Sequence, residues 1–185
     1  MAPPHATATA PTPTSPGTDP DGPGPATDAG LLLLRLALGL TMAAHGAQKL
    51  FGWFDGGGLE GTEQFFASVG YPSAGLMALI AGLTETLGGL ALALGLLTPL
   101  AGAAVLGTML NALAVKWGDG FFAQTGGVEY ELLLVCAAAG LTLTGPGRYA
   151  ADRALPVLPA HRLGHGLAAV LLAAATAGVV LLLRD

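Results

Sequence analysis

Long apolar runs dominate the chain from Leu31 onward. A helix that crosses the ~30 Å hydrocarbon core of a bilayer needs ~20 mostly apolar residues. Residues 73–117 are almost continuously apolar, and as one helix they would be about 67 Å long at about 1.5 Å per residue. This run must therefore fold back, and Thr98-Pro99 is the predicted break because proline lacks a backbone N–H and clashes with the preceding turn. The pattern predicts five spanning helices, at residues ~31–51, ~73–97, ~99–117, ~128–144 and ~163–183.

The same pattern predicts an all-α fold. Open sheet edges cannot lie in lipid, and no part of the chain alternates apolar and polar residues as the strands of a membrane barrel do. Between the first two spans, residues 52–72 mix Phe65 and Phe66 with Glu60 and Glu63. This mixture predicts a short amphipathic helix that lies at the outer membrane surface.

Residues 1–29 differ in composition from the rest of the chain. They hold eight of the thirteen prolines and three aspartates, but no lysine or arginine. Such a segment cannot bury a core, so we expect a disordered tail rich in Pro, Ala, Thr and Gly. It also lacks the basic region and the apolar run of a secretory signal peptide.

Composition and charge support the membrane interpretation. Charged residues are 10% of the chain, against roughly 25% in soluble domains, and the mean hydropathy is +0.64. Lipid-facing surface explains this deficit. The net charge of −5 argues against nucleic acid as a partner, because nucleic-acid binders carry a basic patch. The single cysteine, Cys136, excludes an intramolecular disulfide and a cysteine-rich metal site.

Three of the seven basic residues fall between the last two spans, at Arg148, Arg153 and Arg162. The positive-inside rule places this loop in the cytoplasm. Counting the spans backward places the N-terminus in the cytoplasm as well. The loops at residues 52–72 and 118–127 and the C-terminus are then external.

Glu85 is the ionisable residue that lies deepest in the predicted spans. It stands in the middle of the second span, where a charged group costs ~2.5–3.5 kcal/mol or more. It is either a proton-handling or substrate-binding carboxyl, or a buried carboxyl that only ties helices together. His45 and Lys49 share one face of the first span, and the depth of His45 allows a hydrogen bond or ion pair with Glu85. We therefore predict Glu85 and His45 as a proton relay, with Lys49 in a polar cluster that opens outward.

The predicted binding cluster extends to other residues near the outer helix ends. Glu129 and Glu131 point about 200° apart on a helix, so only one of them can face the bundle. Both carboxylates favour a helix N-terminus; alternatively, Glu129 pairs with Lys49 or Lys116. Asn111 is expected to make an interhelical hydrogen bond. The predicted binding residues are Lys49, Glu129, Asn111 and Lys116.

Several familiar chemistries have no motif in this chain. His161 and His165 have the spacing of a metal-binding pair, but no acidic or cysteine partner stands close by, so we expect interfacial polar residues and no metal site. The chain has no dinucleotide-binding fingerprint, no phosphate-binding loop and no nucleophile elbow. No cofactor site is visible in the sequence.

Residues 31–155 resemble the DoxX family of membrane proteins. The resemblance depends on short motifs in a fixed order, each of them weak alone. They are His45-Gly46-Ala47-Gln48-Lys49-Leu50, Gly70-Tyr71-Pro72, Glu85 before Gly88-Gly89, Gly95 with Thr98, Gly126-Gly127 with Glu129, and Gly145-Pro146-Gly147-Arg148 with Asp152.

The resemblance implies a bacterial inner-membrane four-helix bundle with both of its ends in the cytoplasm. The chain then divides into a tail (1–29), a DoxX-like membrane domain (30–155) and an additional transmembrane helix (156–185). Family members are linked to membrane redox, as a thiosulfate:quinone oxidoreductase subunit and as a partner of thiol and superoxide defence proteins.

We therefore expect a membrane subunit of a quinone-linked or thiol- and sulfur-linked redox system. If the protein is an enzyme, it is an oxidoreductase subunit with quinone as cofactor. Its expected partners are the lipid bilayer, a redox protein or subunit, and further copies of itself. The alternative is a small-solute carrier or a membrane scaffold without enzymatic activity.

Overall fold

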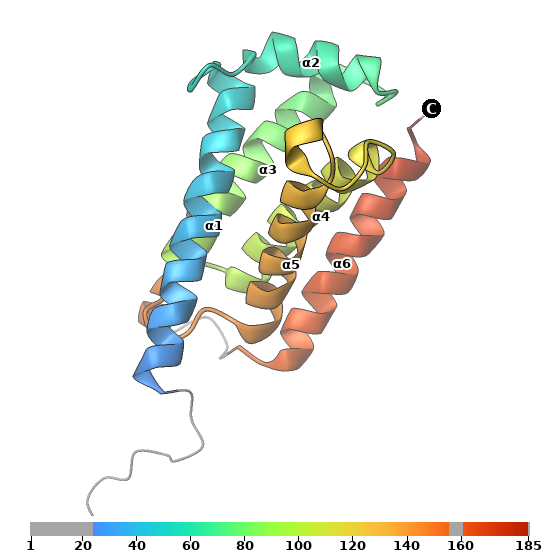
Figure 1. Ribbon diagram of the computed structural model, residues 1–185. Helices are drawn as coiled ribbons and strands as arrows, with labels where there is room; N and C mark the ends of the chain where they lie inside the picture. The colour runs from blue at the N-terminus through green and yellow to red at the C-terminus, as the bar shows by residue number, and fades with distance from the viewer. Residues whose placement is uncertain (1–23, 156–160, 185) are drawn as a thin grey trace, which may run out of the picture.

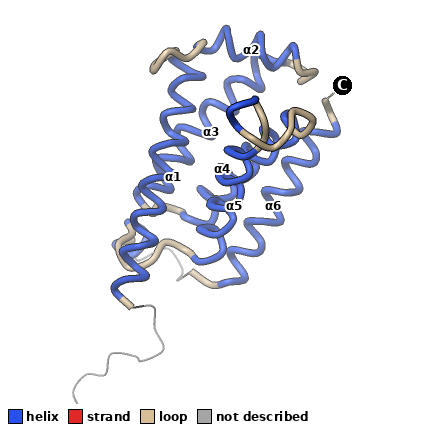
Figure 2. Tube along the Cα trace, viewed as in Figure 1, coloured by secondary structure: helices blue, strands red, loops and turns tan. Residues whose placement is uncertain are grey.

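A computed structural model describes residues 24–155 and 161–184, and this part of the chain is all-helical, without strands (Figures 1 and 2). Most of the predicted tail lies outside the described residues. The six α-helices are α1 (Pro25–Phe51), α2 (Gly58–Ser68), α3 (Ala74–Leu94), α4 (Thr98–Lys116), α5 (Glu129–Thr144) and α6 (Leu163–Leu182), and two short 3-10 helices are η1 (Ala123–Thr125) and η2 (Ala151–Ala154).

Among the described residues, the helices α1, α3, α4 and α6 are long and apolar enough to cross a membrane. The fold is that of a polytopic helical membrane protein, as predicted. Helix α5 has 16 residues and is about 24 Å long at about 1.5 Å per residue, so it is shorter than the other four. The predicted amphipathic helix is α2, which lies across one end of the bundle (Figure 1).

Two helix boundaries differ from the prediction. Helix α1 begins at Pro25 rather than Leu31, so residues 25–29 are helical and not part of a disordered tail. Proline suits the first turn of a helix, and Asp28 in this turn is buried and accepts a hydrogen bond from the backbone N–H of Arg148. Helix α3 ends at Leu94 rather than residue 97, because Gly95 adopts a left-handed conformation with φ of 70°.

Close contact between glycines joins α1 to α3. A Cβ atom on Gly39 of α1 would lie 2.5 Å from the carbonyl oxygen of Gly89 of α3. One on Gly46 would lie 2.7 Å from the carbonyl oxygen of Gly82. Only glycine allows the two backbones to approach so closely, which is the packing role expected of small residues in membrane helices.

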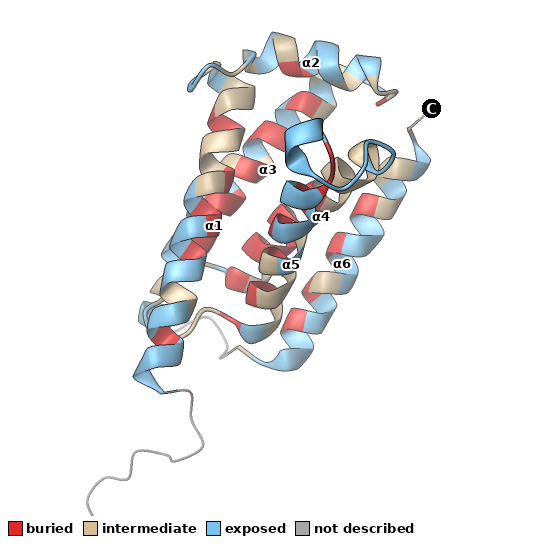
Figure 3. Cartoon of the chain, in the orientation of Figure 1, coloured by how far each residue is buried: buried red, intermediate tan, exposed pale blue. Residues whose placement is uncertain are grey.

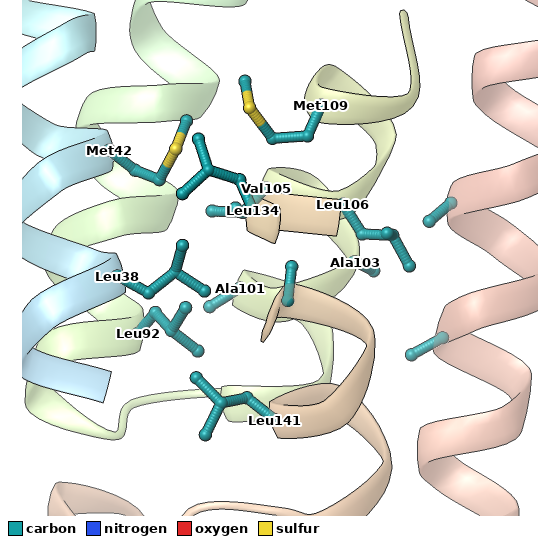
Figure 4. Packing of buried hydrophobic residues seen from close by; sticks show 13 residues of the cluster. Leu38, Met42, Leu92, Ala101, Ala103, Val105, Leu106, Met109, Leu134 and Leu141 are labelled. Atoms are coloured by element: carbon teal, nitrogen blue, oxygen red, sulfur yellow. The ribbon is translucent and has the colours of Figure 1, made fainter. Parts of the chain in front are cut away.

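The buried residues lie on the helix faces that point into the bundle, and the outward faces are mostly exposed (Figure 3). Met42 of α1, Leu92 of α3, Val105 of α4 and Leu141 of α5 belong to one apolar cluster (Figure 4). Helix α6 packs against α4 and α5 through small residues such as Ala173. Many exposed residues on the outside of the bundle are leucines, as expected of a surface that faces lipid.

At the end of the bundle away from α2, polar contacts tie the loops together. The Asp152 carboxylate accepts hydrogen bonds from the backbone N–H groups of Leu97 at 2.7 Å and Thr98 at 3.1 Å, at the start of α4. The fully buried Arg35 of α1 donates to the carbonyl oxygen of Tyr149. These contacts hold the loop after α5 against α1 and the α3–α4 turn.

Candidate functional site

An ion pair between α1 and α3 lies at the centre of the candidate site. The ammonium of Lys49 donates a hydrogen bond of 2.6 Å to the carboxylate of Glu85. Glu85 is 1% exposed, whereas the Lys49 side chain is 27% exposed. The close approach of the two helices at Gly46 brings these side chains within reach of each other. The paired carboxylate satisfies the requirement that a buried charge have a partner.

His45 does not bond to Glu85, so the predicted hydrogen bond or ion pair between these two residues is wrong. Its Nδ1 lies 2.9 Å from Oε1 of Gln48, which is an acceptor, so this nitrogen carries the proton. Its Nε2 lies 2.8 Å from the hydroxyl of Tyr130 on α5, within hydrogen-bond distance. The longer side chain of Lys49, one helical turn further along α1, reaches Glu85 in its place.

A second ion pair joins α4 to α5. Lys116 donates a hydrogen bond of 2.6 Å to Oε1 of Glu131. Glu131 therefore faces the bundle, and the predicted pairing of Glu129 with Lys49 or Lys116 is wrong. Glu129 instead accepts a hydrogen bond of 3.0 Å from the backbone N–H of Ala123. The two glutamates point in different directions from α5, so Glu131 reaches Lys116 while Glu129 contacts the preceding loop.

Asn111 contacts the turn between α2 and α3 rather than another helix. Its side-chain oxygen accepts a hydrogen bond of 3.2 Å from the Tyr71 hydroxyl, and its amide donates to the carbonyl of Gly107 in its own helix. Burial raises the pKa of Tyr71 above its ordinary value, against the opposing effect of the Arg184 guanidinium. The Tyr71 hydroxyl therefore stays protonated at neutral pH and remains a donor.

These side chains line one cavity of about 530 Å³ in the half of the bundle nearest α2. Its volume lies within the range of small-molecule sites, roughly 300–1,000 Å³. Of the six predicted site residues, only Glu129 does not line it. The polar residues that line it are His45, Lys49, Tyr71, Thr84, Glu85, Thr108, Asn111, Lys116, Tyr130, Glu131 and Thr176.

Six polar lining residues were not among the predicted site residues: Tyr71, Thr84, Thr108, Tyr130, Glu131 and Thr176. Glu131 was recognisable as the alternative to Glu129 on α5. Tyr130 stands between the two glutamates, but only the packing of α5 against α1 shows that it reaches His45. Tyr71 lies in a turn, so helical periodicity carries no signal for it.

Within the described residues, no group of three or more His, Cys, Asp or Glu side chains is arranged to hold a metal ion. His161 lies away from the cavity, where its Nε2 is 3.0 Å from the carbonyl oxygen of Leu143.

Comparison with known proteins identifies the family. The sequence pattern of the DoxX family matches residues 30–117. The chain is also 36% identical to the protein named "Putative oxidoreductase CatD" from Bacillus subtilis (strain 168), over 124 residues that make up 66% of this chain and 84% of that protein. The chain belongs to the DoxX family. No solved structure matches this DoxX protein.

The DoxX match covers the residues of the first ion pair and part of the second. His45, Lys49, Glu85 and Lys116 lie within residues 30–117, whereas Glu131 lies beyond them. Helix α6 also lies beyond the matched residues and yet supplies Thr176 to the cavity wall. The cavity is thus built partly by family-matched helices and partly by the C-terminal helix.

Proposed function

We propose that this DoxX protein is the membrane subunit of a redox system and that its cavity binds the headgroup of a quinone. The observation that carries the proposal is the ion pair of the buried Glu85 with the half-buried Lys49, which faces a cavity with largely apolar walls. Ionisable residues within membrane helices mark functional sites by default. The relative named as an oxidoreductase in Bacillus subtilis supports the same class of activity.

The charge balance of the cavity suits a neutral ligand. Two ammonium groups, of Lys49 and Lys116, are each matched by one carboxylate, of Glu85 and Glu131. The matched charges favour a ligand without net charge over an anion or a cation. A quinone ring carries two carbonyl oxygens, and both lysines and the Tyr71 hydroxyl are donors that line the cavity.

A bound quinone supplies an acceptor of two electrons and two protons. The side chains of this chain hold protons beside it, on the Lys49 ammonium and along the Tyr130–His45–Gln48 hydrogen bonds. Tyr130 is 38% exposed, so these hydrogen bonds extend from the cavity to the surface at the α2 end. We propose a thiol donor: two S–H bonds break, one S–S bond forms, and the two electrons and two protons pass to the quinone, which balances the reaction.

We also propose that the α2 end faces away from the cytoplasm in a bacterial inner membrane. Arg148, Arg153 and Arg162 belong to the segment between α5 and α6, at the opposite end, and basic loops are retained on the cytoplasmic side. The redox partner protein would then meet the chain on the side where the cavity opens. A further copy of the chain is an alternative partner at that surface.

The test is a binding titration with menadione, a quinone headgroup without a long chain, on the full-length protein in lipid nanodiscs. Quenching of tryptophan fluorescence reports binding, because Trp53 and Trp117 lie near the α2 end. We expect Glu85→Gln and His45→Ala to weaken binding about tenfold or more, a loss of one charge-assisted or polar contact. Glu129→Gln is the matched control, since Glu129 does not line the cavity. Binding that is unchanged in both Glu85→Gln and His45→Ala would overturn the proposal.

A membrane scaffold without enzymatic activity is the second candidate. It is favoured by the observation that each ion pair joins two neighbouring helices, α1 to α3 and α4 to α5. A scaffold predicts that Glu85→Gln lowers the thermal stability and the recovery of partners from native membranes. Menadione would then bind neither the wild type nor the variants.

A further inference from the structure

The cavity has a side opening between α3 and α6. Ile80 of α3 is 48% exposed and Thr176 of α6 is also exposed, and both residues line the cavity. A residue that is exposed on the outside of a helical bundle and also lines its cavity marks a place where the two surfaces meet. The cavity therefore reaches the outer surface of the bundle as well as its α2 end.

This side opening lies at the depth of lipid chains. Ile80 is six residues from the start of α3, and Thr176 is six residues from the end of α6. At about 1.5 Å per residue, each lies about 9 Å inward from its end of the helix. Both helices are long and apolar enough to span a membrane. The opening thus faces hydrocarbon rather than water.

The walls of the side opening are suited to an apolar chain. Met77 and Val180 line the cavity near it, together with the small residue Ala104. The hydroxyls of Thr108 and Thr176 donate to carbonyl oxygens of their own helices, at 3.1 Å to Ala104 and 2.9 Å to Leu172. Their polar groups are therefore already bonded, and the threonines require no partner from a ligand.

Helix α6 is held in place at the mouth of the cavity. The guanidinium of Arg184, just beyond the end of α6, donates a hydrogen bond of 2.8 Å to the carbonyl of Val69 and lies 5.9 Å from the centre of the Tyr71 ring. Helix α6 lies outside the residues matched by the family. The second wall of the side opening is therefore a feature of the C-terminal part of this chain.

We propose that the side opening holds the hydrocarbon chain of the ligand whose polar ring occupies the cavity. The inference rests on the proposed function and narrows the ligand to a membrane-soluble quinone with a long apolar chain. One molecule with a polar head and an apolar chain fits the shape, because the polar side chains of the cavity and the apolar side opening line one continuous space. A separate lipid chain in the opening is the competing outcome that the test must distinguish.

The test compares two quinones with the same ring, menadione and menaquinone-4, which carries an isoprenoid chain. The full-length protein in nanodiscs is titrated with each. Thr176→Phe places a large side chain in the opening, and Thr176→Leu is a milder change if the first variant does not fold. Ala175→Phe is the matched control, because Ala175 is exposed on the same helix and does not line the cavity.

We expect Thr176→Phe to weaken menaquinone-4 binding about tenfold, through loss of apolar contact. Menadione binding should weaken by a clearly smaller factor, because menadione has no long chain to lose that contact. Ala175→Phe should change neither affinity, and Ile80→Ala, which widens the opening, should retain menaquinone-4 binding. The inference is overturned if Thr176→Phe and the wild type bind menaquinone-4 with equal affinity, which indicates a separate lipid chain in the opening. If menadione binding still depends on Glu85 in that case, the proposed function stands. A wild type that binds neither quinone overturns both.

Discussion

Two glycine-to-alanine substitutions, at Gly46 beside the ion pair and at Gly140 on α5, should change the free energy of unfolding in opposite directions. In Gly46→Ala, the new Cβ atom would lie 2.5 Å from the backbone nitrogen of Thr86 and 2.7 Å from the carbonyl oxygen of Gly82. Ordinary contacts of a Cβ atom begin at 3.4 Å, so α1 and α3 must separate locally by about 1 Å, the difference between 2.5 Å and 3.4 Å. Rotation of the Thr86 side chain does not relieve the clash, because both of these atoms belong to the backbone.

The expected magnitude follows from two opposing effects. Overpacking of a close contact costs ~1–3 kcal/mol, and alanine in place of glycine inside a helix gains up to ~1 kcal/mol. We expect Gly46→Ala to lose about 1–2 kcal/mol in the free energy of unfolding. Lys49 is three residues further along α1, so the separation also lengthens the 2.6 Å contact with Glu85 and weakens menadione binding.

The assay is unfolding by sodium dodecyl sulfate in mixed micelles, followed by circular dichroism. Gly140→Ala on α5 is the matched control, since nothing lies within 4 Å of the added Cβ atom. This variant keeps the helical gain without the clash and should be more stable than the wild type by up to ~1 kcal/mol. The reasoning is refuted if Gly46→Ala is as stable as the wild type, or if both variants change stability in the same direction.

Three further predictions concern the ion pair, the loop cap and the buried tyrosine. Lys49→Met leaves the Glu85 carboxylate buried without its ammonium and should lower the free energy of unfolding by about 3 kcal/mol, the low end of the range because Lys49 is 27% exposed. Adding Glu85→Gln should recover at least half of this loss. Equal free energies of unfolding for the single and double variants would contradict the prediction. Asp152→Ala removes the backbone cap at the start of α4 and should cost ~1–2 kcal/mol in the same assay, whereas Asp119→Ala at an exposed position should stay within ~0.5 kcal/mol. The raised pKa of Tyr71 contributes stability that is fully present below the pKa of an unfolded tyrosine, about 10, and is lost as the pH rises through the higher folded value. The thermal midpoint of the wild type should therefore fall above about pH 10, and a fall of the same size in Tyr71→Phe would show that another group causes it.

Among the described residues, four of the five predicted spans match helices long and apolar enough to cross a membrane. These four could be predicted from the sequence because their signal is local. About 20 apolar residues in a row are enough to indicate a membrane helix, and a proline after Thr98 is enough to indicate the hairpin between α3 and α4. The start of α1 could not be predicted, because Asp28 is held by the backbone of Arg148, far away in the chain. Residues 25–29 have the composition of the tail and the contacts of the bundle.

The sequence could predict which residues lie close together in the site, but not which of them form pairs. The cost of burying Glu85 in lipid indicated that it needs a partner, and the helical repeat placed His45 and Lys49 on one face of α1. The choice between these two partners depends on side-chain length and on the distance between α1 and α3. Likewise, the choice between two glutamates on α5 depends on how that helix is rotated, which no local pattern determines.

The two ends of the bundle differ in a way that bears on where ligands enter. At the end with Arg35 and Asp152, the loops are tied to the helices by side chains that bond to backbone groups. At the α2 end, the Lys116 side chain is 41% exposed and still lines the cavity. The hydrogen bonds of Arg35 and Asp152 at the first end close the fold, whereas Lys116 at the second end lies beside the cavity. A substitution at Asp152 should therefore affect stability alone, and one at Lys116 should affect binding as well.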